Sequence, residues 1–302
     1  MATKLGLSNF LILITVAMIW GSNYILIKVA LSHFSALEMS FIRLLLTAVI
    51  ILPFTFFYVR KTTSDQWRWC IVLGFTGNII PFTLFAIAQT EINSSLAGML
   101  GSLQPAFALL VAVYLYKRKT SRSQIIGILL GLIGALTLLS AGDTIEFDIT
   151  KTGYGSLVIV ATLFYGFSIN LIKEHLGDLR AMHITSVQLS TMLVPSLIGW
   201  LWVVEPKPVN FVTDAAISIF AIIMLASVSS IFGVWLFTRL IRNTGPVVAS
   251  SVAYLIPIVA IMWGLFDNET IYTQQVVGII IVFCGLALIN KQVAHAKEID
   301  AS

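Results

Sequence analysis

Arg43 is the side chain of this sequence best suited to bind a ligand, because it is a charged group within a long apolar run. An ionised side chain inside a bilayer is costly unless it faces water or a partner. The planar guanidinium could hold a carboxylate or a phosphate through two parallel hydrogen bonds. Three structural alternatives stay open: pairing with helix carbonyls, pairing with Glu38, or reaching to the nearer membrane interface.

Polar and aromatic residues of other apolar runs could share a layer with Arg43. At 1.5 Å per residue, Gly21 to Asn23 lie about 18–21 Å from the start of their run, and Arg43 lies about 12 Å below the opposite surface. Hydroxyl and amide groups there could bind a ligand or join helices beside Gly21, and the aromatic rings could stack on a substrate or only pack. The expected substrate-binding residues are Trp20, Ser22, Asn23, Tyr24, Arg43, Tyr165, Ser168, Gln188 and Tyr254.

Three prolines within apolar runs, Pro81, Pro105 and Pro257, each remove a helix hydrogen bond. We expect them to act as hinge or gating positions, with a static kink as the alternative. The sequence has no Asp or Glu in the middle of an apolar run, so the usual signature of a proton relay is missing. Facilitated diffusion or exchange fits at least as well as proton antiport.

The elements that must position these residues are transmembrane helices. Hydrophobic residues make up 58% of the chain and charged residues 11%, with a mean hydropathy of +0.95, whereas soluble domains have roughly 25% charged residues. The apolar runs are continuous and near the ~20 residues that cross a bilayer, which predicts helices rather than barrel strands. We expect an all-α, polytopic membrane protein with ten spans, near residues 9–29, 35–59, 67–88, 94–116, 123–141, 153–173, 184–204, 215–239, 246–266 and 274–291.

The positive charges predict an orientation. With ten spans, fourteen of the 18 Lys and Arg residues fall on one side and three on the other, and Arg43 lies inside a span. The positive-inside rule then places both termini in the cytoplasm. The expected location is the cytoplasmic (inner) membrane. Because the charge is spread over loops, nucleic acid is not an expected partner. Cys70 and Cys284 lie in predicted spans without metal-ligand neighbours, so no metal, disulfide or cofactor is expected.

Similar residues recur along the chain at a nearly constant offset. Gly21 precedes Gly166 by 145 residues, and Pro105 precedes Pro257 by 152. The other matches are Lys28 with Lys173, Arg43 with Gln188, Leu84-Phe85 with Leu236-Phe237, and Gln124, Gly127 and Gly134 with Gln275, Gly278 and Gly285. An odd number of spans per copy inverts the second copy, an arrangement that permits alternating access. The expected repeats are residues 1–146 and 147–302, five helices each, in one integrated membrane domain.

These residues resemble the EamA branch of the drug/metabolite transporter superfamily. The resemblance covers roughly residues 9–290 and rests on Trp20-Gly21-Ser22-Asn23, a following lysine, Arg43, the mid-helix prolines, and the closing Gln-x-x-Gly-(x)6-Gly of each half. It implies ten helices around a central cavity. Members of that family move amino acids, other metabolites or drugs, often outward. The resemblance has one departure. A glutamate is expected after the helix of Pro105 and after the helix of Pro257, the two proline helices; Glu269 is present after the second, but Lys117 stands at the equivalent position after the first.

The expected function is secondary transport, not enzymatic catalysis, because the acid, histidine and metal-binding motifs of membrane enzymes are absent. The substrates would be small metabolites, amino acids or related amphipathic compounds, exported by alternating access. Two alternatives stay open: a carrier of phosphorylated or nucleotide metabolites, and a receptor or scaffold without transport activity. The expected partners are the small-molecule substrate and the lipid bilayer, with a homodimer as an open oligomeric state.

Overall fold

A computed structural model describes residues 7–118, 120–140, 149–204, 215–244, 249 and 252–299. These residues form helices joined by turns and contain no strand, as the composition predicts. The helices are α1 (Leu7–Gly21), α2 (Asn23–Leu31), α3 (Ala36–Tyr58), η1 (Val59–Lys61), α4 (Ser64–Gly74), η2 (Phe75–Ile79), α5 (Ile80–Ala88), α6 (Ser94–Gly101), α7 (Gln104–Tyr114), α8 (Arg122–Leu139), α9 (Ile149–His175), α10 (Ala181–Ser190), α11 (Leu193–Val203), α12 (Ala216–Met224), η3 (Leu225–Gly233), α13 (Val234–Thr244), α15 (Val252–Phe266) and α16 (Thr273–Ile299).

Polar residues beside the apolar runs begin several helices. Ser35 caps α3, because its hydroxyl accepts the N–H of Glu38 while the Glu38 carboxylate accepts the N–H of Ser35. Ser121 and Gln124 make the same reciprocal pair at the start of α8. These bonds satisfy N–H groups that have no partner within their own helix. Glu38 therefore takes part in capping the N-terminus of α3.

Within the described part of the chain, eight helical stretches are long and apolar enough to cross a membrane, by length and composition. They are Leu7–Leu31, Ala36–Lys61, Ser64–Ala88, Ser94–Tyr114, Arg122–Leu139, Thr152–His175, Ala181–Trp202 and Ala216–Thr244. Two shorter apolar helices, Val252–Phe266 and Thr273–Leu288, lie where the last two spans are expected. The chain is thus a multi-pass membrane protein, and the count of ten crossings stays a prediction.

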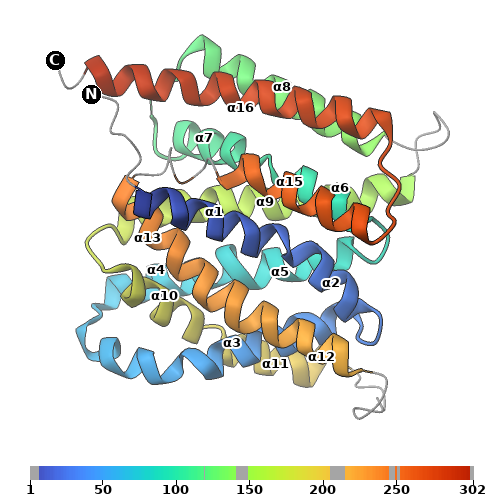
Figure 1. Ribbon diagram of the computed structural model, residues 1–302. Helices are drawn as coiled ribbons and strands as arrows, with labels where there is room; N and C mark the ends of the chain where they lie inside the picture. The colour runs from blue at the N-terminus through green and yellow to red at the C-terminus, as the bar shows by residue number, and fades with distance from the viewer. Residues whose placement is uncertain are drawn as a thin grey trace.

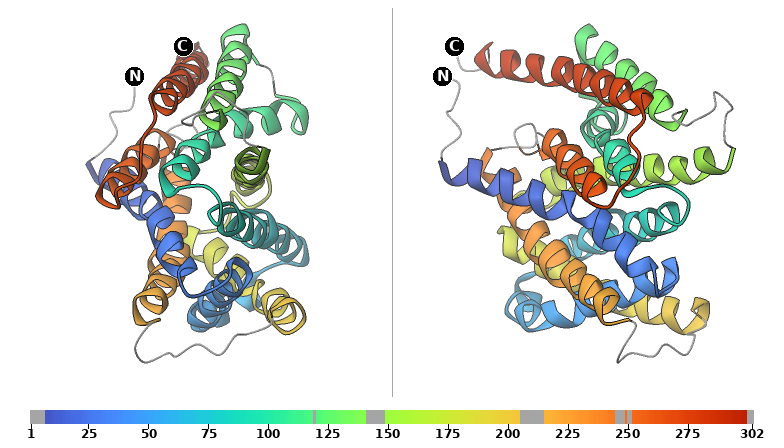
Figure 2. Two further views of the ribbon diagram at one scale, coloured as in Figure 1. Left: turned by 90° about the vertical axis from the view of Figure 1, so that its right-hand side faces the viewer. Right: turned by 45° about the vertical axis from the view of Figure 1, so that its right-hand side comes forward.

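Successive helical stretches run in alternating directions, so α1 begins and α16 ends on the same side of the bundle (Figure 1). Viewed along the helices, α8 and α16 form a pair at one flank (Figure 2). Small residues bring these two helices together, because a Cβ added at Gly285 would lie 2.5 Å from the carbonyl oxygen of Gly127. The other helices surround the centre, with α1 against α15, α3 against α10 and α11, and α9 against α5 and α7.

Five of the eight long stretches are interrupted: α1 breaks from α2 at Ser22, α10 breaks from α11 after Ser190, and three more interruptions lie near the prolines or are π-helical. The π-helical segment η2 joins α4 to α5, just before Pro81, and the π-helical segment η3 joins α12 to α13. A third interruption follows Gly101, where α6 ends, and Pro105 stands in the first turn of α7. A proline cannot donate the hydrogen bond that would continue the preceding helix. Pro257 lies inside α15, which continues through it, and the hinge role of all three buried prolines stays a prediction.

Candidate functional site

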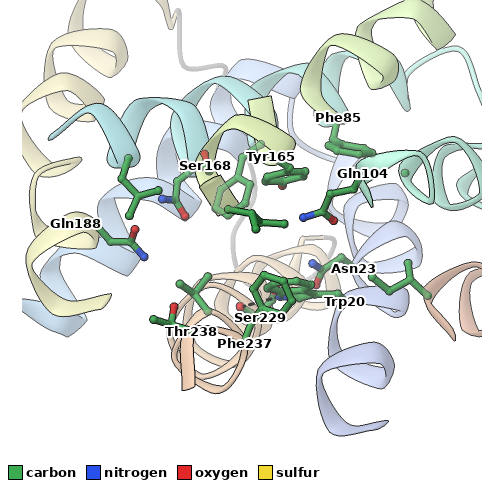
Figure 3. Close-up of a pocket in the computed structure, with 18 of the residues that line it drawn as sticks. Trp20, Asn23, Phe85, Gln104, Tyr165, Ser168, Gln188, Ser229, Phe237 and Thr238 are labelled. Atoms are coloured by element: carbon green, nitrogen blue, oxygen red, sulfur yellow. Dashed lines mark hydrogen bonds between the residues drawn. The ribbon is translucent and has the colours of Figure 1, made fainter. Parts of the chain in front are cut away.

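A central cavity of about 110 Å³ lies between helices from both halves of the chain (Figure 3). One water needs roughly 10–15 Å³ of such space, so the cavity has room for several waters or a small molecule. The described residues that line it are Trp20, Asn23, Tyr24, Ile27, Arg43, Leu73, Gly77, Asn78, Phe82, Phe85, Gly101, Gln104, Tyr165, Ser168, Ile169, Ile172, Gln188, Ser229, Val234, Phe237, Thr238 and Ile256.

Arg43 projects from α3 into the wall of the cavity and is only 2% exposed. Its Nε donates to the Ser230 hydroxyl at 3.1 Å, and its Nη2 donates to the Ser229 hydroxyl at 3.4 Å. The guanidinium carbon lies 3.7 Å from the centre of the Phe82 ring. No ion pair joins Arg43 to a carboxylate among the described residues. The cation therefore has neutral partners only, and several of its five N–H donors are not used by them.

Three further polar atoms of the cavity wall are buried without a hydrogen-bond partner. They are Oδ1 of Asn23, Oδ1 of Asn78 and Oγ1 of Thr238. Leaving a buried polar atom unpaired costs about 1–3 kcal/mol, so such atoms are uncommon in a folded interior. Asn23 lies near Gln104 at one end of the cavity, and Thr238 lies near Gln188 at the other (Figure 3). The cavity thus offers a ligand one cation and several hydrogen-bonding groups.

Aromatic rings form much of the remaining wall. The Tyr24 ring meets Phe85 edge-on at 5.7 Å, and Phe85 stacks with Tyr165 at 6.0 Å between ring centres. Trp20 lies 4.7 Å from Phe237 and donates to the carbonyl of Ser229 at 3.4 Å. These rings can hold an apolar body by stacking and can attract a cationic group through their faces.

A glycine makes room for one of these rings. A Cβ added at Gly101 would lie 2.6 Å from the Tyr24 hydroxyl oxygen. A separation below 3 Å from a carbon atom requires one of the two groups to move. The glycine at the end of α6 therefore lets Tyr24 occupy its place in the cavity wall.

Seven of the nine residues expected to bind substrate line the cavity: Trp20, Asn23, Tyr24, Arg43, Tyr165, Ser168 and Gln188. The other two, Ser22 and Tyr254, lie outside its lining. The Ser22 hydroxyl accepts the indole N–H of Trp263 at 2.8 Å, and Tyr254 packs against Phe283 with ring centres 5.7 Å apart. We leave Ser22 and Tyr254 out of the candidate site for this reason.

Several polar residues of the site were not among the expected ones. Asn78 and Gln104 line the cavity, and Ser229, Ser230 and Thr238 come from η3 and α13. The only signal for them was polar residues in the middle of apolar spans, a pattern shared by many residues that bond helix to helix. The π-helical geometry of η3, which sequence periodicity does not reveal, turns both serines toward Arg43.

A second polar cluster lies outside the cavity, where α2 and α15 end. Lys28 pairs with Asp267 and, at 3.0 Å, with Glu269. Both carboxylate oxygens of Glu269 also accept bonds from Ser94 and Ser95, each through its backbone N–H and its hydroxyl. Burial would raise the pKa of Glu269, but the bonds from Ser95, Ser94 and Lys28 outweigh it and lower this pKa from 4.5 to about 2.

Known proteins resemble this chain over nearly its whole length. The model of the EamA-like transporter family matches residues 7–140 and 154–291. A probable amino-acid metabolite efflux pump of Salmonella typhimurium is 25% identical over 288 residues, covering 92% of this chain and 93% of the pump. The uncharacterized inner membrane transporter YedA of Escherichia coli is 23% identical over 293 residues, covering 94% and 91%. One solved crystal structure has the same fold, with a TM-score of 0.60 at 12% identity over 96% of this chain and 98% of its own.

These similarities agree with the family expected from the sequence. The matched segments include the Trp20-Gly21-Ser22-Asn23 motif, the buried Arg43 and the helices that contain Pro105 and Pro257. The two relatives are named as a pump and a transporter, not as enzymes. The chain belongs to the EamA-like transporter family and is a multi-pass membrane transporter.

Proposed function

We propose that this protein exports small carboxylate-bearing metabolites, amino acids or related amphipathic compounds, by alternating access through the central cavity. The observation that carries the proposal is Arg43, a buried cation in the cavity wall with hydroxyl and aromatic partners but no carboxylate among the described residues. Burying an uncompensated charge is costly, and a substrate carboxylate would remove much of that cost.

The other cavity groups suit the remainder of such a substrate. The unpaired amide oxygens of Asn23 and Asn78 can accept hydrogen bonds from an ammonium or amide group. The rings around Tyr24, Phe85 and Tyr165 can pack against an apolar side chain. Phosphorylated and nucleotide metabolites fit less well, because Arg43 is the only cationic side chain in the described lining and a phosphate carries more charge.

Two inverted five-helix repeats, residues 1–146 and 147–302, would supply the alternating access. Supporting this, the two π-helical segments, centred near residues 77 and 229, lie about 152 residues apart, which is the offset of Pro105 and Pro257. The matched glycines also make matched contacts. A Cβ added at Gly21 would lie 2.5 Å from Val259 Cβ, and one added at Gly166 would lie 2.6 Å from the backbone nitrogen of Ala108. In each half, the first helix touches the proline helix of the other half.

The proposed direction follows from the membrane orientation and from a relative. The distribution of Lys and Arg supports cytoplasmic termini in the inner membrane, with ten crossings. The Salmonella typhimurium relative is named as a probable efflux pump for amino-acid metabolites. Export from the cytoplasm is therefore the direction that we propose.

Flux measurements in liposomes that contain the purified protein test this function. Vesicles loaded with a radiolabelled amino acid should release it faster than protein-free vesicles. The matched control is the amide of the same amino acid, which lacks the carboxylate and should not be moved. A phosphorylated metabolite forms the third arm. Transport of the amide or the phosphate, but not of the free amino acid, would overturn the proposal, and no flux of any of them would favour a receptor or scaffold.

A further inference from the structure

Hydrogen bonds join the turn between α5 and α6 to two other parts of the bundle. At its start, Nε2 of Gln89 donates to the backbone oxygen of Tyr24 on α2 at 2.7 Å. At its end, Ser94 and Ser95 bind Glu269, which follows α15. The turn therefore joins the cavity wall at Tyr24 to the polar cluster at Lys28. We call this end of the bundle the Lys28 side.

Glu269 is well suited to hold a helix N-terminus. The backbone N–H groups of Ser94 and Ser95 reach it at 3.0 Å and the two hydroxyls at 2.7 Å, while Asn93 accepts the N–H of Leu96 at 2.8 Å. The first three N–H groups of α6 are thus all bonded. A carboxylate is favourable there because of the charge and the aligned N–H dipoles. Its side chain is 3% exposed, so water screens these bonds little.

The corresponding position on the opposite side of the bundle carries the opposite charge. The two proline helices end alike, with Lys117 at φ 53° after α7 and Asn268 at φ 58° after α15. The next residues are Arg118 and Glu269, so the backbone matches Glu269 with Arg118 and not with Lys117, the residue that the sequence comparison placed there. Arg118 pairs with Glu174 at the end of α9, and these side chains are 37% and 30% exposed. An arginine has no acceptor atom and cannot bind the N–H groups of a helix N-terminus.

We propose that Glu269 latches the turn between α5 and α6 closed, and that the empty transporter therefore rests with the Lys28 side shut and its cavity reachable from the opposite side. This inference rests on the alternating access of the proposed function. Five hydrogen bonds to one buried carboxylate hold the Lys28 side, whereas one exposed ion pair stands at the matching position on the other. If the termini are cytoplasmic, the Lys28 side is external, and the resting state loads cargo from the cytoplasm.

Thiol labelling with a membrane-impermeant maleimide tests the latch. In a background with Cys70→Ser and Cys284→Ser, the cavity-lining position Ile27 is changed to cysteine as a reporter next to Lys28. Glu269→Gln removes the charge and presents donors to the N–H groups of α6. We expect it to raise the labelling rate from the Lys28 side at least about tenfold.

Asp267→Asn is the matched control. Asp267 also pairs with Lys28, but its side chain is 40% exposed and it makes no bond to α6. It should change the labelling rate less than about twofold, because exposed ion pairs contribute little. An equal rise in Glu269→Gln and Asp267→Asn, or no rise in Glu269→Gln, would overturn the latch.

Two further variants keep the test decisive. If Glu269→Gln does not fold, the double variant Ser94→Ala and Ser95→Ala removes two of the five bonds and should give a smaller rise in labelling. Arg118→Gln should leave labelling from the Lys28 side within about twofold, because the weaker side is already open. A large fall in that labelling rate would contradict the proposed resting state. Labelling needs no substrate, so these results stand apart from a failure of the flux assay.

Discussion

Replacing Arg43 with methionine should weaken substrate binding by about 100-fold or more without weakening the fold. Methionine keeps an unbranched side chain that can pack near Phe82, and it removes the charge. In the empty transporter the guanidinium donates to two hydroxyl groups and pairs with no carboxylate among the described residues. These bonds offset only part of the cost of burying its charge. We therefore expect the melting temperature of the empty variant to equal or exceed that of the wild type.

The loss of binding can be calculated from the hydrogen bonds that a substrate carboxylate would no longer make. Two charge-assisted bonds contribute roughly 1.5 kcal/mol each at the low end of their range, so affinity should fall by about 100-fold or more. A ligand at 100 times its Kd stabilises the wild type by about 2.7 kcal/mol. At the same ligand concentration, the variant would gain at most about 0.4 kcal/mol.

The assay is thermal unfolding of the purified protein with and without a carboxylate ligand. The control variant is Arg239→Met, which removes an exposed arginine that contacts Trp235 and does not line the cavity. It should keep the full ligand-induced shift. If Arg43→Met melts well below the wild type, or if it also keeps the full shift, Arg43 is a structural group and the reasoning is wrong.

Three further predictions concern the same structure. The pKa of Glu269 is about 2 in the closed latch against an ordinary 4.5, so its contribution to closure is complete above about pH 4.5 and is lost as the pH falls toward 2. Because maleimide reacts with the thiolate, labelling is compared at each pH with that of Glu269→Gln, and the ratio of the two rates should be constant from pH 5 to 8 and approach one only in stronger acid. Gly21→Val should destabilise the empty protein by about 1–3 kcal/mol, seen as a lower melting temperature, because its Cβ would overlap Val259. Ser230→Ala should raise the Kd of a carboxylate ligand about tenfold without abolishing binding, because it removes the hydroxyl that orients Nε of Arg43, and unchanged affinity would show that this bond does not position the guanidinium.

Much of the fold could be predicted because it depends on properties that are local in the sequence. Helix length and composition identify the eight long apolar stretches, and the motifs around Trp20 and Arg43 indicate the family. The depth of Arg43 in its span also follows from counting residues. Counting does not say which way a side chain points, however. Neighbouring residues of a helix point about 100° apart, so Asn23 faces the cavity while Ser22 faces Trp263.

The sequence by itself determined the membrane residence, the helical class and a buried arginine, because each follows from residue type and spacing along one run. The tertiary structure alone decided which groups meet. Ser230 lies 187 residues from Arg43, and Glu269 lies 241 residues from Lys28. The π-helical geometry of η3 shifts its side chains away from the faces that a regular helix would give them. Such contacts depend on how whole helices rotate and pack against one another, and no local pattern records that.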